Sequence, residues 1–120
     1  MKNASSVNAP LILFCYNRLE TLKKVISSLQ SDHLTQNTDI FIFSDGPKSN
    51  SISDKSKVEE VRKYLDSLEN FSKSLKIFGH KENLGLSESI IYGIDKVSAQ
   101  NESFIVLEDD LMISPYFLTY

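Results

Sequence analysis

The stretch FIVLEDDLMISP, which spans residues 104–115, runs four apolar residues directly into three consecutive carboxylates, Glu108, Asp109 and Asp110. A short apolar run of this kind is typical of a strand buried inside a sheet. Adjacent carboxylates repel one another, and partial burial makes ionising them still less favourable. A hard divalent cation relieves both penalties, because Mg²⁺ and Mn²⁺ favour carboxylate oxygens. The segment therefore predicts a strand that ends at a metal site, with a solvated acidic turn as the competing interpretation.

The chain before this stretch repeats one pattern, in which short apolar runs alternate with segments whose apolar residues recur at steps of three and four. The runs are expected to be strands and the periodic segments amphipathic helices. The predicted strands are residues 10–16, 39–44, 74–79 and 103–107, and the predicted helices are residues 18–30, 57–71 and 86–97. Alternation of this kind produces a parallel sheet with helices on its faces. The sequence therefore predicts an α/β fold that is Rossmann-like, with three α/β/α layers around a mainly parallel sheet.

The apolar strand residues should form the core of this fold. They include Ile12, Phe14, Ile42, Ile105 and Leu107. Gly93 falls inside the third helix, where a glycine costs about 1 kcal/mol relative to alanine. It either weakens the helix or marks a close approach between helix and sheet. A fourth helix is expected to begin at Pro115, with Ser114 as its N-cap.

The composition is that of one folded domain spanning residues 1–120. Apolar residues make up 41% of the chain and charged residues 24%, which favours a globular protein over a disordered one. The net charge is −3, and no block of basic residues occurs. Because nucleic-acid binding depends on clustered Lys and Arg, this charge pattern argues against a DNA or RNA partner.

Cysteine usage and hydropathy bear on the compartment. Cys15 is the only cysteine, so no internal disulfide can form, as is usual in a reducing compartment. The N-terminal segment MKNASSVNAP lacks the apolar region of a signal peptide, and no apolar run approaches the roughly 20 residues that span a bilayer. We therefore expect a cytoplasmic protein, or one peripheral to the cytosolic face of a membrane, with no transmembrane segment in this chain.

Polar and small residues gather where the predicted strands end, which is the edge at which a parallel sheet binds its ligands. In chain order they are Tyr16, Asn17 and Arg18, then Asp45, then Asn83 and Gly85, and finally the carboxylate triplet. The first three groups also have local interpretations. Asn17 can cap a helix, Asp45 can begin a turn with Gly46, and Asn83 can belong to a helix-entry turn.

Three common classes with acidic or glycine-rich strand ends lack their motifs here. The chain contains neither GxxxxGK[ST] nor GxGxxG, so a P-loop protein and a dinucleotide-binding Rossmann domain have no phosphate cradle. A response-regulator receiver requires an acid pair after its first strand, where this chain has CYNR. The strand ends must therefore serve another kind of site.

With all four strand ends considered, the chain resembles the nucleotide-sugar-dependent glycosyltransferases of the A-type fold. It is most similar to the family-2-like and the N-acetylglucosaminyltransferase-I-like enzymes. The resemblance covers residues 10–118 and is carried by the segments ILFCYNR, IFIFSDGPK, ENLGLSESIIYGI and FIVLEDDLMISPYFL. The carboxylate triplet resembles the D-x-D metal motif of this group. One acid pair is a weak signal, whereas four segments in this order at four strand ends are a specific one.

The resemblance implies a nucleotide-binding role for the strand ends. The implied contacts are Tyr16, Asn17, Arg18, Asp45, Asn83, Gly85, Glu108 and Asp109. Among them, Arg18 and Asp45 resemble contacts to the base, and Glu108 and Asp109 resemble contacts to the ribose and the donor sugar. Asp110 resembles the carboxylate that binds Mn²⁺ or Mg²⁺, which stabilises the departing nucleoside diphosphate. A UDP-sugar is the favoured donor.

Enzymes of this group also have a second half, which binds a carbohydrate or glycoconjugate acceptor and supplies the catalytic base. No candidate base is found in this chain, so we expect it beyond Tyr120. The chain is interpreted as a truncated A-type fold, the donor-binding half of a longer glycosyltransferase, inactive on its own. Two alternatives stay open. One is a sugar-phosphate nucleotidyltransferase-like enzyme, although CYNRLETLKK lacks its Gly-rich phosphate loop, and the other is a catalytically inactive nucleotide-sugar-binding or interaction module.

Overall fold

The computed structural model describes residues 9–101 and 103–109 of the chain. In chain order, its elements are β1 (Leu11–Cys15), α1 (Leu19–Ser31), the 3₁₀ helix η2 (His33–Asn37), β2 (Asp39–Ser44), α2 (Ile52–Ser67), β3 (Ser74–Gly79), α3 (Leu86–Ser98) and β4 (Ile105–Glu108). The four strands form one sheet in the order β3-β2-β1-β4, and every neighbouring pair is parallel. The predicted α/β fold with a parallel sheet is therefore confirmed.

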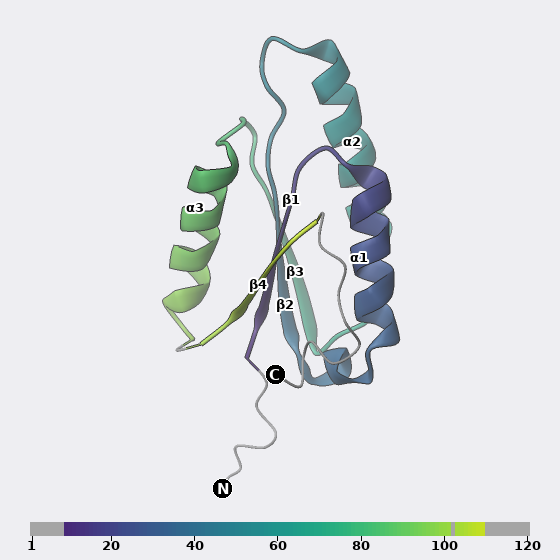
Figure 1. The fold of residues 1–120 in the computed structure, drawn as a ribbon, viewed down its shortest axis with the longest axis vertical. Helices are drawn as coiled ribbons and strands as arrows, with labels where there is room; N and C mark the ends of the chain where they lie inside the picture. The colour runs from purple at the N-terminus through teal and green to yellow at the C-terminus, as the bar shows by residue number, and fades with distance from the viewer. Residues whose placement is uncertain (1–8, 102, 110–120) are drawn as a thin grey trace, which may run out of the picture.

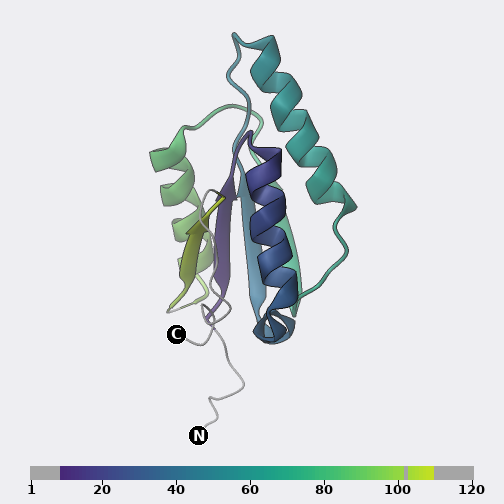
Figure 2. The same cartoon turned by 45° about the vertical axis from the view of Figure 1, so that its right-hand side comes forward.

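The helices form two layers, one on each face of the sheet. Figures 1 and 2 show α1 and α2 on one face and α3 on the other. The residues of β1 are all buried, and their side chains alternate between the two layers. Leu11 and Leu13 pack in the same cluster as α1 and α2, whereas Ile12 and Phe14 pack in the cluster of α3. Among the described helices, none is both long and apolar enough to cross a membrane.

The order of the strands creates a switch point between β1 and β4. The chain steps outward from β1 to β2 and β3 through α1 and α2, and α3 then returns it to the far side of β1. Because right-handed crossovers that run in opposite directions lie on opposite faces, α3 covers the face that α1 and α2 leave open. The Asp109 amide donates a hydrogen bond to the Phe14 carbonyl at 3.1 Å, which joins the ends of β4 and β1. Sheets of this kind bind ligands in the crevice at such a switch point.

The start of α2 differs from the prediction. The helix begins at Ile52 and not at residue 57, because Ser51 Oγ accepts a hydrogen bond from the Asp54 amide at 3.1 Å and caps it. It ends at residue 67 instead of 71. The loop between β2 and α2 is therefore shorter than the polar composition of residues 45–54 indicates.

β4 lies at the edge of the sheet among the described strands. Ile105 is for this reason only partly buried, which corrects its prediction as a core residue. The other predicted core residues are buried: Ile12, Phe14, Ile42 and Leu107. The helix predicted to begin at Pro115, with its cap, lies outside the described residues.

Gly93 lets α3 lie close to the sheet. A β-carbon at this position would stand 2.6 Å from the Phe14 ring and 3.1 Å from the Phe43 ring. These two rings stack with their centroids 5.6 Å apart, so each limits how far the other can move. Of the two interpretations that the sequence left open, the close approach between helix and sheet is confirmed.

We expect Gly93→Ala to lower the free energy of unfolding by about 1–3 kcal/mol, as an extra methyl group in a packed core does. The sign of this stability change distinguishes a packed from an exposed Gly93, because in an exposed helix the same substitution raises stability by about 1 kcal/mol. Urea denaturation followed by circular dichroism measures the difference. A variant at least as stable as the wild type would show that α3 does not approach the sheet this closely.

Candidate functional site

A cavity of about 350 Å³ opens at the switch point between β1 and β4. Its walls come from four places that are distant in sequence: the end of β1 with the loop after it, the end of β2, the first turn of α3 and the end of β4. The lining residues are residues 14–18, Asp45, Leu86, Ser89, Glu108 and Asp109. A cavity of this size lies at the lower end of the range for small-molecule sites.

The loop after β1 is anchored to α2 by one buried carboxylate. Asp54 accepts hydrogen bonds from the Tyr16 hydroxyl and, at 2.8 Å, from the Asn17 side-chain amide. The Lys48 backbone amide donates to the same carboxylate at 2.8 Å. These bonds tie the loop after β1 to the loop after β2. Asn17 does not cap α1, whose N-cap position is Arg18 and has no capping side chain.

These hydrogen bonds also shift the pKa values of Asp54 and Tyr16. Burial alone would raise the pKa of Asp54, but the hydrogen bonds from Tyr16, the Lys48 amide and Asn17 outweigh it and lower that pKa. Burial, reinforced by the bond to Asp54, raises the pKa of the Tyr16 hydroxyl. The phenol therefore remains a donor to a charged carboxylate, which is one of the stronger kinds of hydrogen bond.

Asp45 holds the loop after β3 to the end of β2. Its Oδ1 accepts hydrogen bonds from the amides of Gly46 and Leu84, both at 2.8 Å. Its Oδ2 accepts from the Gly85 amide at 3.1 Å and from the Asn83 side-chain amide at 3.3 Å. A carboxylate offers about four acceptor positions, so those of Asp45 are all used. Because Gly85 is the N-cap of α3, this negative charge also lies at the positive end of the helix dipole.

Arg62 of α2 restrains the same region from the other side. Its Nε donates to Ser44 Oγ at 2.8 Å. Its Nη2 donates to the carbonyl oxygens of Ser44, Asp45 and His80 at 3.1, 3.2 and 2.7 Å. Gly79 makes room for the guanidinium, since a β-carbon there would stand 2.8 Å from Nη1. The backbone at the ends of β2 and β3 is thus held by one side chain.

Glu108 and Asp109 form an acidic wall at the end of β4. The Glu108 carboxylate makes no hydrogen bond or ion pair with the part of the chain that the structure describes. Burial, followed by the charge of Asp109, raises the pKa of the Cys15 thiol to about 12. The Cys15 thiol is therefore neutral. Asp110, the predicted metal ligand, lies outside the described residues.

The acidic wall fits the donor set of a hard cation. Within residues 9–101 and 103–109, no group of three His, Cys, Asp or Glu side chains could hold a metal ion. Mg²⁺ and Mn²⁺, however, are commonly held by one or two carboxylates, with phosphate oxygens and water completing the shell. Glu108 and Asp109 line an open cavity, and a third carboxylate follows them directly in the sequence. The residues present are compatible with such an ion.

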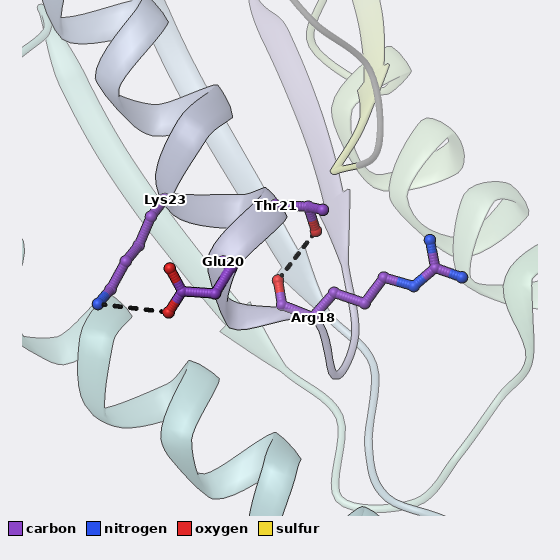
Figure 3. A network of polar contacts seen from close by, with 4 residues as sticks. All are labelled: Arg18, Glu20, Thr21 and Lys23. Carbon is purple, nitrogen blue, oxygen red and sulfur yellow. Dashed lines mark hydrogen bonds and ion pairs between the residues drawn. The ribbon is translucent and has the colours of Figure 1, made fainter.

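Arg18 places a cation beside the cavity. Its side chain is exposed and extends away from α1, as Figure 3 shows. The Arg18 carbonyl accepts a hydrogen bond from Thr21 Oγ1 at 3.1 Å, whereas the guanidinium has no partner among the described residues. The ion pair between Lys23 and Glu20 in the same view, at 3.9 Å, is exposed and contributes little stability. The Arg18 guanidinium is therefore available to an anionic or carbonyl-bearing ligand.

The structure brings most of the predicted nucleotide contacts together. The cavity is lined by Tyr16, Asn17, Arg18, Asp45, Glu108 and Asp109. Asn83 and Gly85 do not line it, and they contact the carboxylate of Asp45 instead. The role of each of these residues toward a nucleotide stays a prediction.

Sequence reasoning missed three residues that shape the site. Asp54 carries a recognisable signal, because Ser51 and Asp54 have the S-x-x-D spacing of a capping box. Arg62 carries no such signal, and Ser89 lies in the segment ENLGLSESIIYGI, whose resemblance to the family does not single out this residue. Their contacts depend on how α2 and α3 pack against the strand ends, which no local pattern specifies.

We expect Asp54→Asn to lower the free energy of unfolding by about 2 kcal/mol at pH 7, because it removes hydrogen bonds to a charged group. The pKa of Asp54 is lowered by folding. Its contribution is therefore present above the ordinary carboxyl value of 3.8 and is lost as the pH falls through the folded value. Urea denaturation at pH 7 and at decreasing pH should show a difference between variant and wild type that shrinks in acid.

Asp66→Asn is the matched control for this measurement, because Asp66 is an exposed carboxylate on the same helix. It should change stability little at any pH. A loss in Asp54→Asn that does not depend on pH would contradict the charged hydrogen bonds assigned to this residue.

Comparison with known proteins bears directly on this site. A search of curated protein sequences gives no match. The model of the family described as glycosyl transferase family 2 matches residues 11–120. The match covers the four strands, the cavity-lining residues and the acidic triplet, and it supports the predicted glycosyltransferase of the A-type fold. The chain belongs to glycosyl transferase family 2.

Proposed function

We propose that this chain binds the nucleotide of a nucleotide-diphospho-sugar in the cavity at the switch point, as the donor-binding part of a glycosyltransferase. The observation that carries the proposal is the make-up of this cavity in a family-2 chain. Such a donor joins an aromatic base to a charged diphosphate. Phe14 and Leu86 offer apolar walls, Arg18 offers a cation, and the end of β4 offers carboxylates.

Mn²⁺ or Mg²⁺ is the proposed cofactor. Asp110 would hold the ion, as the last residue of the acidic triplet, and Glu108 and Asp109 would contact the ribose and the donor sugar. When bound, such an ion acts as a Lewis acid for a departing nucleoside diphosphate. In its absence the carboxylates and the diphosphate repel each other. Nucleotide affinity should therefore depend on the metal.

The remaining nucleotide contacts divide into those that face a ligand and those that hold the loops. Arg18 belongs to the first kind, since its planar guanidinium suits phosphate and carbonyl oxygens and has no described partner. Tyr16 and Asn17 belong to the second, because their polar groups bond to Asp54. Loops that are held before binding lose less entropy when a ligand arrives. UDP is the proposed nucleotide and a carbohydrate or glycoconjugate the proposed acceptor, both on the family resemblance.

We expect UDP to bind more tightly in the presence of Mg²⁺, and Asp110→Asn to remove most of that gain while leaving metal-free binding in place. Asparagine keeps the shape of the side chain and removes its charge. Titration of ¹⁵N-labelled protein by NMR suits an affinity near millimolar, about −4 kcal/mol. Paramagnetic Mn²⁺ in place of Mg²⁺ should broaden the amide signals of Glu108 and Asp109 in the wild type and much less in the variant.

Asp66→Asn again serves as the control, and it should keep the full metal-dependent gain. An equal gain in Asp110→Asn and the wild type would remove Asp110 from the metal site. If UDP with Mg²⁺ shifts no signal of the cavity-lining residues in the wild type, the proposed function is wrong for this chain.

We expect Arg18→Ala to weaken UDP binding about tenfold, which corresponds to 1.4 kcal/mol. The free energy of unfolding should not change, because the side chain is exposed and without a described partner. The loss should shrink as ionic strength rises, since salt screens an exposed charge. Lys24→Ala, which removes an exposed cation from α1, is the matched control. Equal UDP affinities of Arg18→Ala and the wild type would exclude this contact.

A further inference from the structure

Ser89 lines the cavity, and its buried hydroxyl has no hydrogen-bond partner among the described residues. Among the described residues, the buried side-chain atoms without a hydrogen-bond partner are Asp32 Oδ2, His80 Nε2 and Ser89 Oγ. Of these three residues, only Ser89 lines the cavity. Its side chain is 4% exposed. A buried hydroxyl without a partner is unfavourable, and native proteins rarely keep one without a reason.

The Ser89 hydroxyl does not bond to the backbone carbonyl that a helical serine commonly uses. A serine inside a helix commonly donates to the carbonyl four residues before it. In α3 that carbonyl belongs to Gly85, and it accepts the Ser89 backbone amide at 3.0 Å. The hydroxyl makes no bond to it. Ser89 Oγ therefore keeps its capacity both to donate and to accept a hydrogen bond.

The other polar groups from the ends of β1 and β2 are already engaged. The Tyr16 hydroxyl and the Asn17 amide donate to Asp54. The four acceptor positions of Asp45 are filled by the loop after β3 and by Gly46. On this side of the cavity, an incoming ligand would meet Arg18 at the surface and Ser89 in the interior.

The surroundings of Ser89 suit a neutral group with apolar surface better than a phosphate. The positive end of α3 already faces the negative charge of Asp45, so a second anion there would lie beside a carboxylate. Phe14, Cys15 and Leu86 line the same cavity with apolar surface. Small-molecule pockets typically combine such apolar walls with a few placed polar groups that fix orientation.

We propose that the Ser89 hydroxyl forms a hydrogen bond to the edge of the donor's nucleobase and thereby helps to orient the base. This inference rests on the proposed function. It adds a base-contacting residue on α3, within the segment ENLGLSESIIYGI that carries part of the family resemblance. On binding, the bond would provide the partner that Ser89 Oγ lacks within the described chain.

The proposal predicts opposite effects of Ser89→Ala on stability and on affinity. The unliganded variant should be at least as stable as the wild type, because an unpartnered hydroxyl is removed and alanine is the better helix former. Uridine and UDP should both bind about tenfold more weakly. Inorganic pyrophosphate, which has no base, should bind equally to both proteins. A purely structural role for Ser89 would instead lower stability and weaken every ligand alike.

The experiment measures urea denaturation and NMR titrations of the full chain with uridine, UDP and pyrophosphate. Ser87→Ala is the matched control, because Ser87 lies in the same turn of α3, is exposed and does not line the cavity. Its affinities should equal those of the wild type. Unchanged uridine binding by Ser89→Ala, or a loss that appears equally with pyrophosphate, would overturn the base contact while leaving the proposed function intact. A wild type that binds neither uridine nor UDP would overturn the proposed function and this inference together.

Discussion

The carboxylate of Asp45 is the group on which the arrangement of this site depends. It joins three segments, the end of β2, the loop after β3 and the start of α3, through four N–H donors. A buried charge is tolerated only when its hydrogen bonds are satisfied, so the loop must follow one path. Gly46 permits that path, since a β-carbon there would stand 2.5 Å from the Glu82 carbonyl oxygen and 2.7 Å from that of His80.

A second carboxylate, that of Asp54, holds other segments of the site together. Asp54 joins the loop after β1 to the loop after β2, and Arg62 joins the ends of β2 and β3. The loop after β1, the end of β2 and the start of α3 are therefore held by hydrogen bonds within the protein before any ligand binds. Sites of this kind require a supporting shell, because groups that bind a ligand are effective only when their positions are held.

This support divides the polar residues at the strand ends and on α3 into two sets. Tyr16, Asn17, Asp45 and Asn83 use their polar side-chain groups within the protein. Arg18, Ser89 and Glu108 have no such partner among the described residues and line the cavity. The free groups differ in charge: a cation near the start of α1, a neutral hydroxyl on α3 and a carboxylate at the end of β4. The cavity is thus lined by both neutral and charged groups that come from three different elements.

The sequence by itself determined the elements and their order. The strands at 39–44 and 74–79 have the bounds that their apolar runs predict, and the polar residues that follow the strands meet at one edge of the sheet. Hydrophobic periodicity is sufficient for this, because it reports which face of each segment is buried. The start of α2 was predicted wrongly, although the Ser51-x-x-Asp54 spacing marks it.

Only the tertiary structure decided which partner each polar side chain has. Asn17 resembles a helix cap in the sequence, yet its amide bonds to Asp54, 37 positions away. Ser89 resembles an ordinary helical serine until the packing of α3 shows that its hydroxyl is buried at a cavity without a partner. Gly93 became interpretable only when the Phe14 ring was found against it. The physical reason is common to all three: a side-chain contact depends on segments that folding brings together, and no pattern within one segment records its distant neighbour.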